Sequence, residues 1–235
     1  MGLAWSFFNP ILMLLVFTFV FSVVFKARWG IGTEESKTDF AIILFVGMII
    51  HGLFAECVTN APGLILANVN YVKKVVFPLE ILPWIAMGSA LFHALVSLGV
   101  WAVFYLLVFR EMHWTAMFFP LVILPLVLGT MGVAWFLTSL GVFLRDVTQI
   151  IGILTTVLLF LSPIFYPISA LPKEYRVLLQ VNPLTFMIEE TRAVLIWGRA
   201  PDWTGWVVYF SVSVIVAWLG FWWFQKTRKG FADVL

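Results

Sequence analysis

Residues 145–192 read RDVTQIIGILTTVLLFLSPIFYPISALPKEYRVLLQVNPLTFMIEETR. The stretch begins as an apolar run and then meets Pro163, Pro167, Pro172 and Pro183. Because proline removes a backbone donor and clashes with the preceding turn, one continuous helix cannot cross this region. Membrane proteins keep broken helices only where protein or a water-filled cavity satisfies the freed backbone groups. In an apolar chain, this stretch therefore predicts a gate or pathway element.

The chain as a whole is strongly apolar. Of its 235 residues, 63% are hydrophobic and 11% are charged, which is far from the composition of a soluble domain. The long uniform runs favour helices of about 20 residues over the alternating segments of about 10 residues found in membrane barrels. Cys57 is the only cysteine, which excludes a disulfide within the chain. We expect an all-α integral membrane protein with a single domain over residues 1–235.

Apolar runs predict six membrane-spanning helices. They cover residues 11–25, 40–58, 81–109, 115–143, 147–161 and 203–224. Pro10 is expected to introduce the first helix, and residues 30–39 are expected to form a polar loop. Of the 14 Lys and Arg residues, six fall in predicted inner loops and eight in predicted outer loops, so charge alone does not decide the orientation.

The segment 62–76 is apolar enough to touch a membrane but carries Lys73 and Lys74. It predicts a short helix at the membrane interface, with Phe77 and Pro78 turning the chain into the third span. The two lysines have two interpretations. They mark a cytoplasmic loop, or they lie beside a partner or attract a phosphate group.

Polar groups near the proline-rich stretch also allow alternatives. Asn182 and Pro183 form a natural helix start, and a spacing of three places Glu189 and Arg192 on one helix face. This pair is either solvated at the outer surface or, in a re-entrant segment, costly and therefore functional. Glu190 lies beside them in the sequence.

The remaining ionisable groups predict little chemistry. Arg145 and Asp146 fit the cytoplasmic end of a helix, where an acid before the first turn favours the helix dipole. Glu56 is expected near the inner end of the second span, where a partner or water satisfies it. The three histidines, His51, His93 and His113, lack the spacing of a helical metal pair, so no metal site is expected. No GxxxxGK[ST] loop occurs, so ATP hydrolysis would require a separate subunit.

Five motifs resemble the membrane subunits of type-two ABC exporters, especially the Wzm-like permeases for O-antigen, capsule and teichoic-acid polysaccharides. They are GLAW at 2–5 with Asn9-Pro10, NVNYVKKVVFPLEILP at 68–83, FLRDV at 143–147, SPIFYP at 162–167 and NPLTFMIEETR at 182–192. They occur in order across nearly the whole chain. Family members usually begin with a basic amphipathic segment, whereas this sequence starts almost on the first motif, which leaves part of the expected ATPase contact open.

The resemblance implies a permease in the bacterial inner membrane with cytoplasmic termini. Its partners would be a second copy of itself and two copies of an ATPase subunit that binds ATP and Mg. Its substrate would be a polyprenyl-diphosphate-linked polysaccharide. Segment 62–76 would be the cytoplasmic coupling region, and the broken region 162–199 would form outer gate helices.

The resemblance also assigns residues to these roles. The coupling residues are Asn68, Tyr71, Lys73, Lys74, Phe77 and Pro78. The gate residues are Ser162, Pro163, Tyr166, Pro167, Asn182, Pro183, Glu189, Glu190 and Arg192. Independently of the resemblance, aromatic rings stack on the apolar faces of sugars, and the candidates to line a glycan pathway are Phe17, Phe21, Phe165 and Tyr166.

Three other functions are considered. An ABC exporter of a drug or small lipid would share the fold. An ion-coupled secondary transporter should carry charges in mid-span and matching breaks in two halves of the chain, and the main break here lies in one half. A membrane enzyme acting on a polyprenyl-linked sugar would need converging acids, bases or a metal. The resemblance favours the polysaccharide permease.

Overall fold

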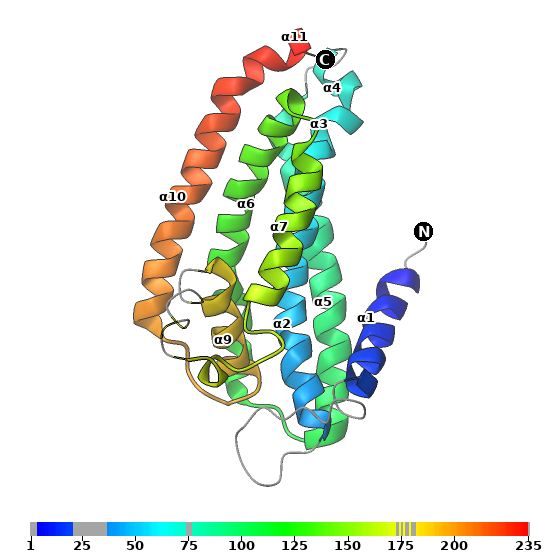
Figure 1. Cartoon of the computed structure of the whole chain (residues 1–235), viewed down its shortest axis with the longest axis vertical. Helices are drawn as coiled ribbons and strands as arrows, with labels where there is room; N and C mark the ends of the chain where they lie inside the picture. The colour runs from blue at the N-terminus through cyan, green and yellow to red at the C-terminus, as the bar shows by residue number, and fades with distance from the viewer. Residues whose placement is uncertain are drawn as a thin grey trace. The chain divides into compact units, whose positions relative to one another are not determined.

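The computed structural model describes residues 4–20, 37–73, 77–172, 174, 176, 179 and 182–234. Within these ranges every regular element is a helix, and no strand occurs (Figure 1). The longer helices are α1 (Ala4–Phe17), α2 (Lys37–Asn60), α5 (Leu82–Phe109), α6 (Phe119–Phe143), α7 (Val147–Leu161), α9 (Pro183–Leu195) and α10 (Trp203–Thr227). The prediction of an all-α chain is confirmed for this part of the protein.

Among the residues that the structure describes, four stretches of helix are long and apolar enough to cross a membrane. They are Asp39–Ala67, Leu79–Phe109, Trp114–Phe143 and Trp203–Gly230. They contain 28 to 31 residues each, which exceeds the roughly 20 residues needed to span the hydrocarbon core. Trp5–Val20 and Val147–Leu161 are shorter apolar helices, and they fall where the first and fifth spans are predicted.

Two predicted boundaries are wrong. Helix α1 begins at Ala4, so Pro10 lies inside the helix instead of introducing it. Proline inside a helix loses the bond to the carbonyl four residues earlier and its ring crowds that carbonyl, but membrane helices tolerate this where other groups satisfy the backbone. Helix α2 begins at Lys37, within the predicted polar loop, and Asp39 in its first turn complements the helix dipole.

The chain divides into two compact units. The first contains residues 1–51, 92–122 and 158–201, and the second contains residues 52–91, 123–157 and 202–235. The single-domain assignment stays a prediction.

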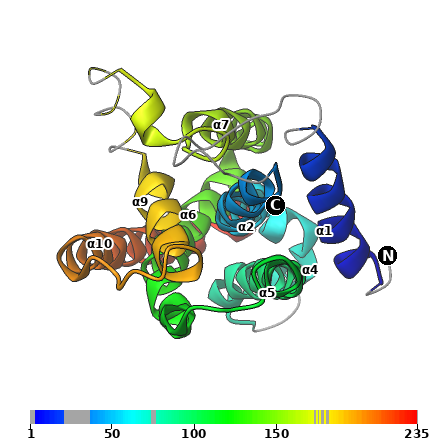
Figure 2. The same ribbon diagram turned by 90° about the horizontal axis from the view of Figure 1, so that it is seen from below.

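In the first unit, the amino-terminal half of α2 forms the core. Residues 40–47 are all buried, as expected for a helix that is apolar on every side. Trp101 of α5 is 1% exposed and donates its indole N–H to the Ile42 carbonyl at 3.2 Å. Helices α1 and α9 lie on opposite sides of α2 (Figure 2).

In the second unit, α6 and α10 pack backbone to backbone. A Cβ atom at Gly220 would overlap the Gly132 carbonyl, and one at Gly132 would lie 2.6 Å from the Ala217 nitrogen. Helices pack this closely in membranes where small residues line the interface. The pair Gly132 and Gly220 therefore fixes where α6 and α10 cross.

Candidate functional site

Helix α9, which carries Glu189 and Arg192, begins as the sequence predicts. Asn182 is its N-cap, and the Asn182 side-chain oxygen accepts a hydrogen bond from the Leu184 N–H at 2.9 Å. Pro183 occupies the first turn, where its missing donor costs nothing.

Asn182 also links α9 to the end of α7. Its side-chain amide donates to the Ser162 hydroxyl at 2.9 Å, and that hydroxyl donates to the Leu158 carbonyl at 2.6 Å. Ser162 is completely buried. The structure thus brings together two of the predicted gate residues that are 20 positions apart in the sequence.

Arg192 is the centre of this site in the first unit. Its side chain is completely buried and donates hydrogen bonds to backbone carbonyls and to Glu189. The guanidinium donates through Nε to the Ile43 carbonyl at 3.2 Å and through Nη2 to the Ile164 carbonyl at 3.2 Å. Its Nη1 donates to the Pro163 carbonyl at 2.6 Å and to Glu189 Oε1 at 2.9 Å. Arg192 therefore joins α9, α2 and the turn that follows α7.

The arrangement explains how the chain tolerates a break after α7. Carbonyls in the turn at a helix end lack intrahelical partners, and each buried one needs a donor. The planar guanidinium supplies several donors in fixed directions, which a lysine cannot do. The sequence alternative of a solvated pair is wrong for Arg192, whereas the Glu189 side chain is 40% exposed.

The electrostatics follow from this burial. Burial lowers the pKa of the Arg192 guanidinium to about 10, and the Glu189 carboxylate opposes part of that shift by charge and by hydrogen bonding. The guanidinium remains charged at neutral pH. One carboxylate and three backbone carbonyls then surround one buried positive charge.

Gly47 of α2 provides the space for the guanidinium. A Cβ atom at Gly47 would lie 3.0 Å from Arg192 Nη2 and 3.3 Å from Ile164 Cγ1. Sequence reasoning missed Gly47, because a glycine inside an apolar span gives no sign of the group packed against it.

The other predicted gate and pathway residues that the structure describes near α7 and α9 make separate local contacts. The Tyr166 hydroxyl donates to the Phe160 carbonyl at 3.0 Å, and Phe165 stacks on Phe160 with ring centroids 5.6 Å apart. Pro167 caps a short 3₁₀ helix, η5 (Ile168–Ala170). Glu190 is half-buried on α9. Their roles stay predictions.

Two of the pathway aromatics belong to the first span. Phe17 is half-buried in α1, and Phe21 lies outside the described residues. Their contribution to a pathway stays a prediction.

The predicted coupling segment belongs to the second unit and is not one helix. It consists of η2 (Ala61–Gly63), α3 (Leu64–Ala67) and α4 (Val69–Lys73). The break is at Asn68, which has φ −127° and ψ 36° and whose side-chain amide donates to the Leu64 carbonyl at 2.9 Å. Asparagine competes in this way with helical backbone bonding, which accounts for the wrong prediction of a continuous helix over 62–76.

The end of the segment agrees with prediction more closely. Tyr71 and Phe77 stack with ring centroids 4.8 Å apart, so two predicted coupling residues are in contact. Pro78 caps η3 (Leu79–Ile81), which leads into α5. The backbone of Lys73 belongs to α4, but its side chain and all of Lys74 lie outside the described residues.

Helix α6 supports the coupling segment through residues that sequence reasoning missed. The Thr138 hydroxyl donates to the Ala61 carbonyl at 3.0 Å, and Thr138 is completely buried. A Cβ atom at Gly141 would overlap the Pro62 carbonyl oxygen, so the two backbones touch. Small and hydroxyl residues in an apolar helix often mark the close approach of another backbone. The sequence contains many such residues, so this pattern alone does not single out Thr138 and Gly141.

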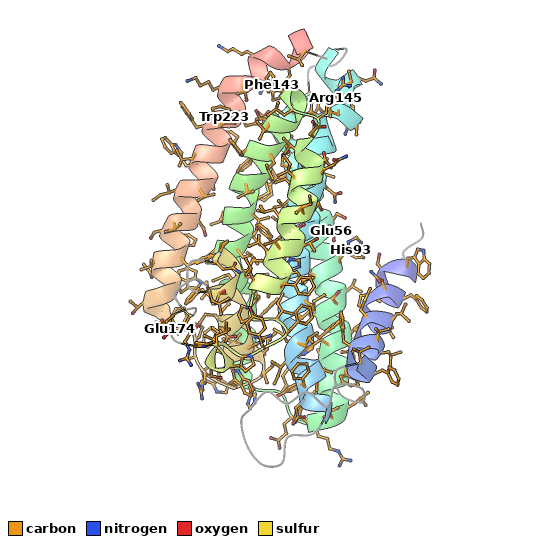
Figure 3. All side chains as sticks on the ribbon, in the orientation of Figure 1. Glu56, His93, Phe143, Arg145, Glu174 and Trp223 are labelled. Carbon is orange, nitrogen blue, oxygen red and sulfur yellow. The ribbon has the colours of Figure 1, made fainter. Side chains whose placement is uncertain are left out.

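Glu56 and Arg145, two further residues singled out in the sequence, also lie in the second unit, and Figure 3 labels both. The Glu56 carboxylate of α2 accepts a hydrogen bond from the Ser89 hydroxyl of α5 at 3.2 Å, so the expected partner is present. Arg145 and Asp146 are exposed in the turn between α6 and α7, at the helix end where they are expected.

The histidines do not form a common site. His51 is buried in α2, and the His113 ring packs against Gly198, whose φ of +63° favours glycine. Within the part of the chain that the structure describes, no three His, Cys, Asp or Glu side chains gather to hold a metal ion.

The apolar helices define an integral membrane protein that crosses the bilayer several times. The sequence matches the family described as ABC-2 type transporter over residues 1–196. The chain belongs to this family.

Individual relatives match over most of their length. The chain is 26% identical to an O-antigen export system permease protein of Myxococcus xanthus, over 99% of this chain and 87% of that protein. It is also 26% identical to an O-antigen export system permease protein of Klebsiella pneumoniae, over 100% of this chain and 88% of that protein. A polysialic acid transport protein of Escherichia coli is 24% identical over 84% of this chain and 75% of its own length.

Proposed function

We propose that this chain is the membrane-spanning permease subunit of an ATP-driven exporter that moves a lipid-linked, O-antigen-like polysaccharide across the bacterial inner membrane. The observation that carries the proposal is the end-to-end similarity to relatives whose names state export or transport of a polysaccharide. Membership of the ABC-2 type transporter family supports the same class of machine.

The working assembly is a homodimer of this permease with two copies of an ATPase subunit. The sequence has no phosphate-binding loop, so ATP and Mg bind to the partner subunit. Helices α1 and α7 serve as the two further spans and bring the total to six. The short length of α7 fits a span that ends where the gate region begins.

In the mechanism, closure of the ATPase subunits displaces the coupling segment 62–76. The segment transmits this displacement to α6 because Thr138 and Gly141 contact its first residues. The broken region 162–199 controls the outer exit. Arg192 anchors this region to α2, so the turn after α7 and helix α9 move together.

An exporter of a drug or small lipid in the same family is the second candidate. The relatives' names favour polysaccharide, because they state O-antigen export and polysialic acid transport. Neighbouring genes for glycosyltransferases would agree with this preference.

Reconstitution tests the proposal directly. The permease and its ATPase subunit are placed in lipid vesicles together with a polyprenyl-linked polysaccharide. ATP should drive the glycan across the bilayer, and a variant of the ATPase that cannot hydrolyse ATP should not. The absence of ATP-dependent movement with an active ATPase would sink the proposal.

A further inference from the structure

The carboxyl-terminal residues contact the short helix that follows the coupling segment 62–76. Arg228 follows α10 in the short 3₁₀ helix η6 (Arg228–Gly230), and Glu80 lies in η3 just before α5. Arg228 Nη1 donates to Glu80 Oε2 at 3.0 Å, and the two side chains are 40% and 26% exposed. An ion pair thus connects the residues that follow α10 to η3, the short helix between the coupling segment and α5.

Other groups hold both ends of this ion pair. The Trp135 indole of α6 donates to the Glu80 carbonyl at 3.1 Å. Ser139 lies on α6 one turn after Trp135, and Thr227 immediately precedes Arg228. The hydroxyls of Ser139 and Thr227 lie 2.6 Å apart. Glu80 and Arg228 are therefore fixed to the same face of α6, and neither is a free surface charge.

The tail beyond Arg228 is packed against the same elements. Phe231 opens the short helix α11 (Phe231–Val234) and is completely buried. Its ring contacts Phe143 and Phe224, with centroid distances of 5.9 and 5.6 Å. Helix α11 also contacts α4 of the coupling segment (Figure 1). The tail consequently contacts α4 within the coupling segment and η3 just after it.

We propose that residues 226–234 form a brace through which displacement of the coupling segment is transmitted to α10. Displacement of the coupling segment then displaces α10 directly. Glu80 and Arg228 are positioning residues in this device, since they act through the elements they join. The proposal rests on the proposed function, because the displacement comes from the ATPase.

The ion pair is suited to a test because its removal should leave the fold intact. Pairs exposed to this degree contribute little to folding. The buried contacts of Phe231 and the glycine contacts between α6 and α10 hold the fold without it. A change in transport without a change in stability is therefore the signature of the brace.

The experiment uses the full chain, reconstituted with its ATPase subunit and a lipid-linked polysaccharide. Glu80→Gln, Arg228→Gln and the exchanged pair Glu80→Arg with Arg228→Glu are compared with Lys229→Gln, which removes a neighbouring positive charge outside the pair. The readouts are ATP hydrolysed, glycan moved and the unfolding midpoint temperature.

Each single variant should lower the glycan moved per ATP several-fold with little change in midpoint. The exchanged pair should restore most of the loss, and Lys229→Gln should resemble the wild type. A wild-type amount of glycan moved per ATP in both single variants would overturn the brace. A lowered amount that the exchanged pair does not restore would also overturn it. If the wild-type protein itself moves no glycan, the proposed function fails and the brace with it.

Discussion

Gly47 and Arg192 fit against each other inside the first unit. A single added carbon at Gly47 would lie 3.0 Å from the Arg192 Nη2 atom, while Arg192 Nε bonds to the Ile43 carbonyl one turn earlier in α2. Because Gly47 has no side chain, the Arg192 guanidinium can lie directly against α2 at this position. Sequence separation gives no hint of this relationship, because the two residues lie on different helices.

Substitution of Gly47 tests this fit. Gly47→Ala should destabilise the permease by about 1–3 kcal/mol, because the guanidinium is buried and bonded and has no free space to move into. Gly52→Ala is the matched control on the same helix, since nothing lies within 4 Å of a Cβ atom there. Thermal unfolding followed by the fluorescence of the 12 tryptophans measures both. Equal effects of the two variants would refute the close fit.

The Arg192–Glu189 pair should respond unequally to loss of either member. Arg192→Gln leaves three buried backbone carbonyls short of donors, so stability should fall by about 3 kcal/mol or more. Glu189→Gln keeps a side-chain oxygen that accepts a hydrogen bond, and this side chain is 40% exposed, so the loss should be clearly smaller than that of Arg192→Gln. Unfolding midpoints of the two variants give the comparison. Similar losses would show that the ion pair, and not the carbonyl contacts, matters most.

Arg192 should contribute no pH dependence near neutrality. Its folded-state pKa is lowered to about 10, below its value in the unfolded chain, so the group is protonated in both states at lower pH. Only above pH 10 does the folded state lose its proton first, and the group's titration then favours folding. Between about pH 6 and pH 8, the difference in midpoint between wild type and Arg192→Gln should be constant. A difference that drifts with pH over that interval would mean that Arg192 titrates there.

The contact between α6 and the coupling segment allows a second glycine test. Gly141→Ala places a carbon against the Pro62 backbone, so stability should fall by about 2 kcal/mol or more and export should fall with it. Gly152→Ala on α7 is the control, because nothing lies within 4 Å of its Cβ position. Export of surface polysaccharide and the unfolding midpoint should both distinguish the variants. Unchanged export in Gly141→Ala would separate α6 from the coupling path.

The sequence predicts the apolar helices well because long runs of hydrophobic residues have few alternatives in a membrane. Span boundaries from 79 to 161 agree with the structure within a few residues. Asn182 and Pro183 predict a helix start through local backbone chemistry alone, and the structure has one there. The errors at Pro10 and Asn68 concern residues whose effect depends on which neighbours satisfy the backbone.

Tertiary pairs are less predictable than helices. The spacing of three pairs Glu189 with Arg192, but it does not indicate that Ile43, Pro163 and Ile164 supply the other acceptors. The Glu80–Arg228 pair joins residues 148 positions apart, and several other acids and bases in the sequence are equally suitable partners. Burial and three-dimensional geometry determine these contacts, and the local sequence pattern predicts neither.

The most direct measurement of the proposed function is deletion of the gene in its own host, with the wild-type gene returned as a control. Surface polysaccharide and the lipid-linked polymer inside the cell are both quantified. The account predicts that surface polymer disappears while the lipid-linked form accumulates inside, and that the returned gene reverses both changes. Normal surface polysaccharide in the deletion strain would contradict it.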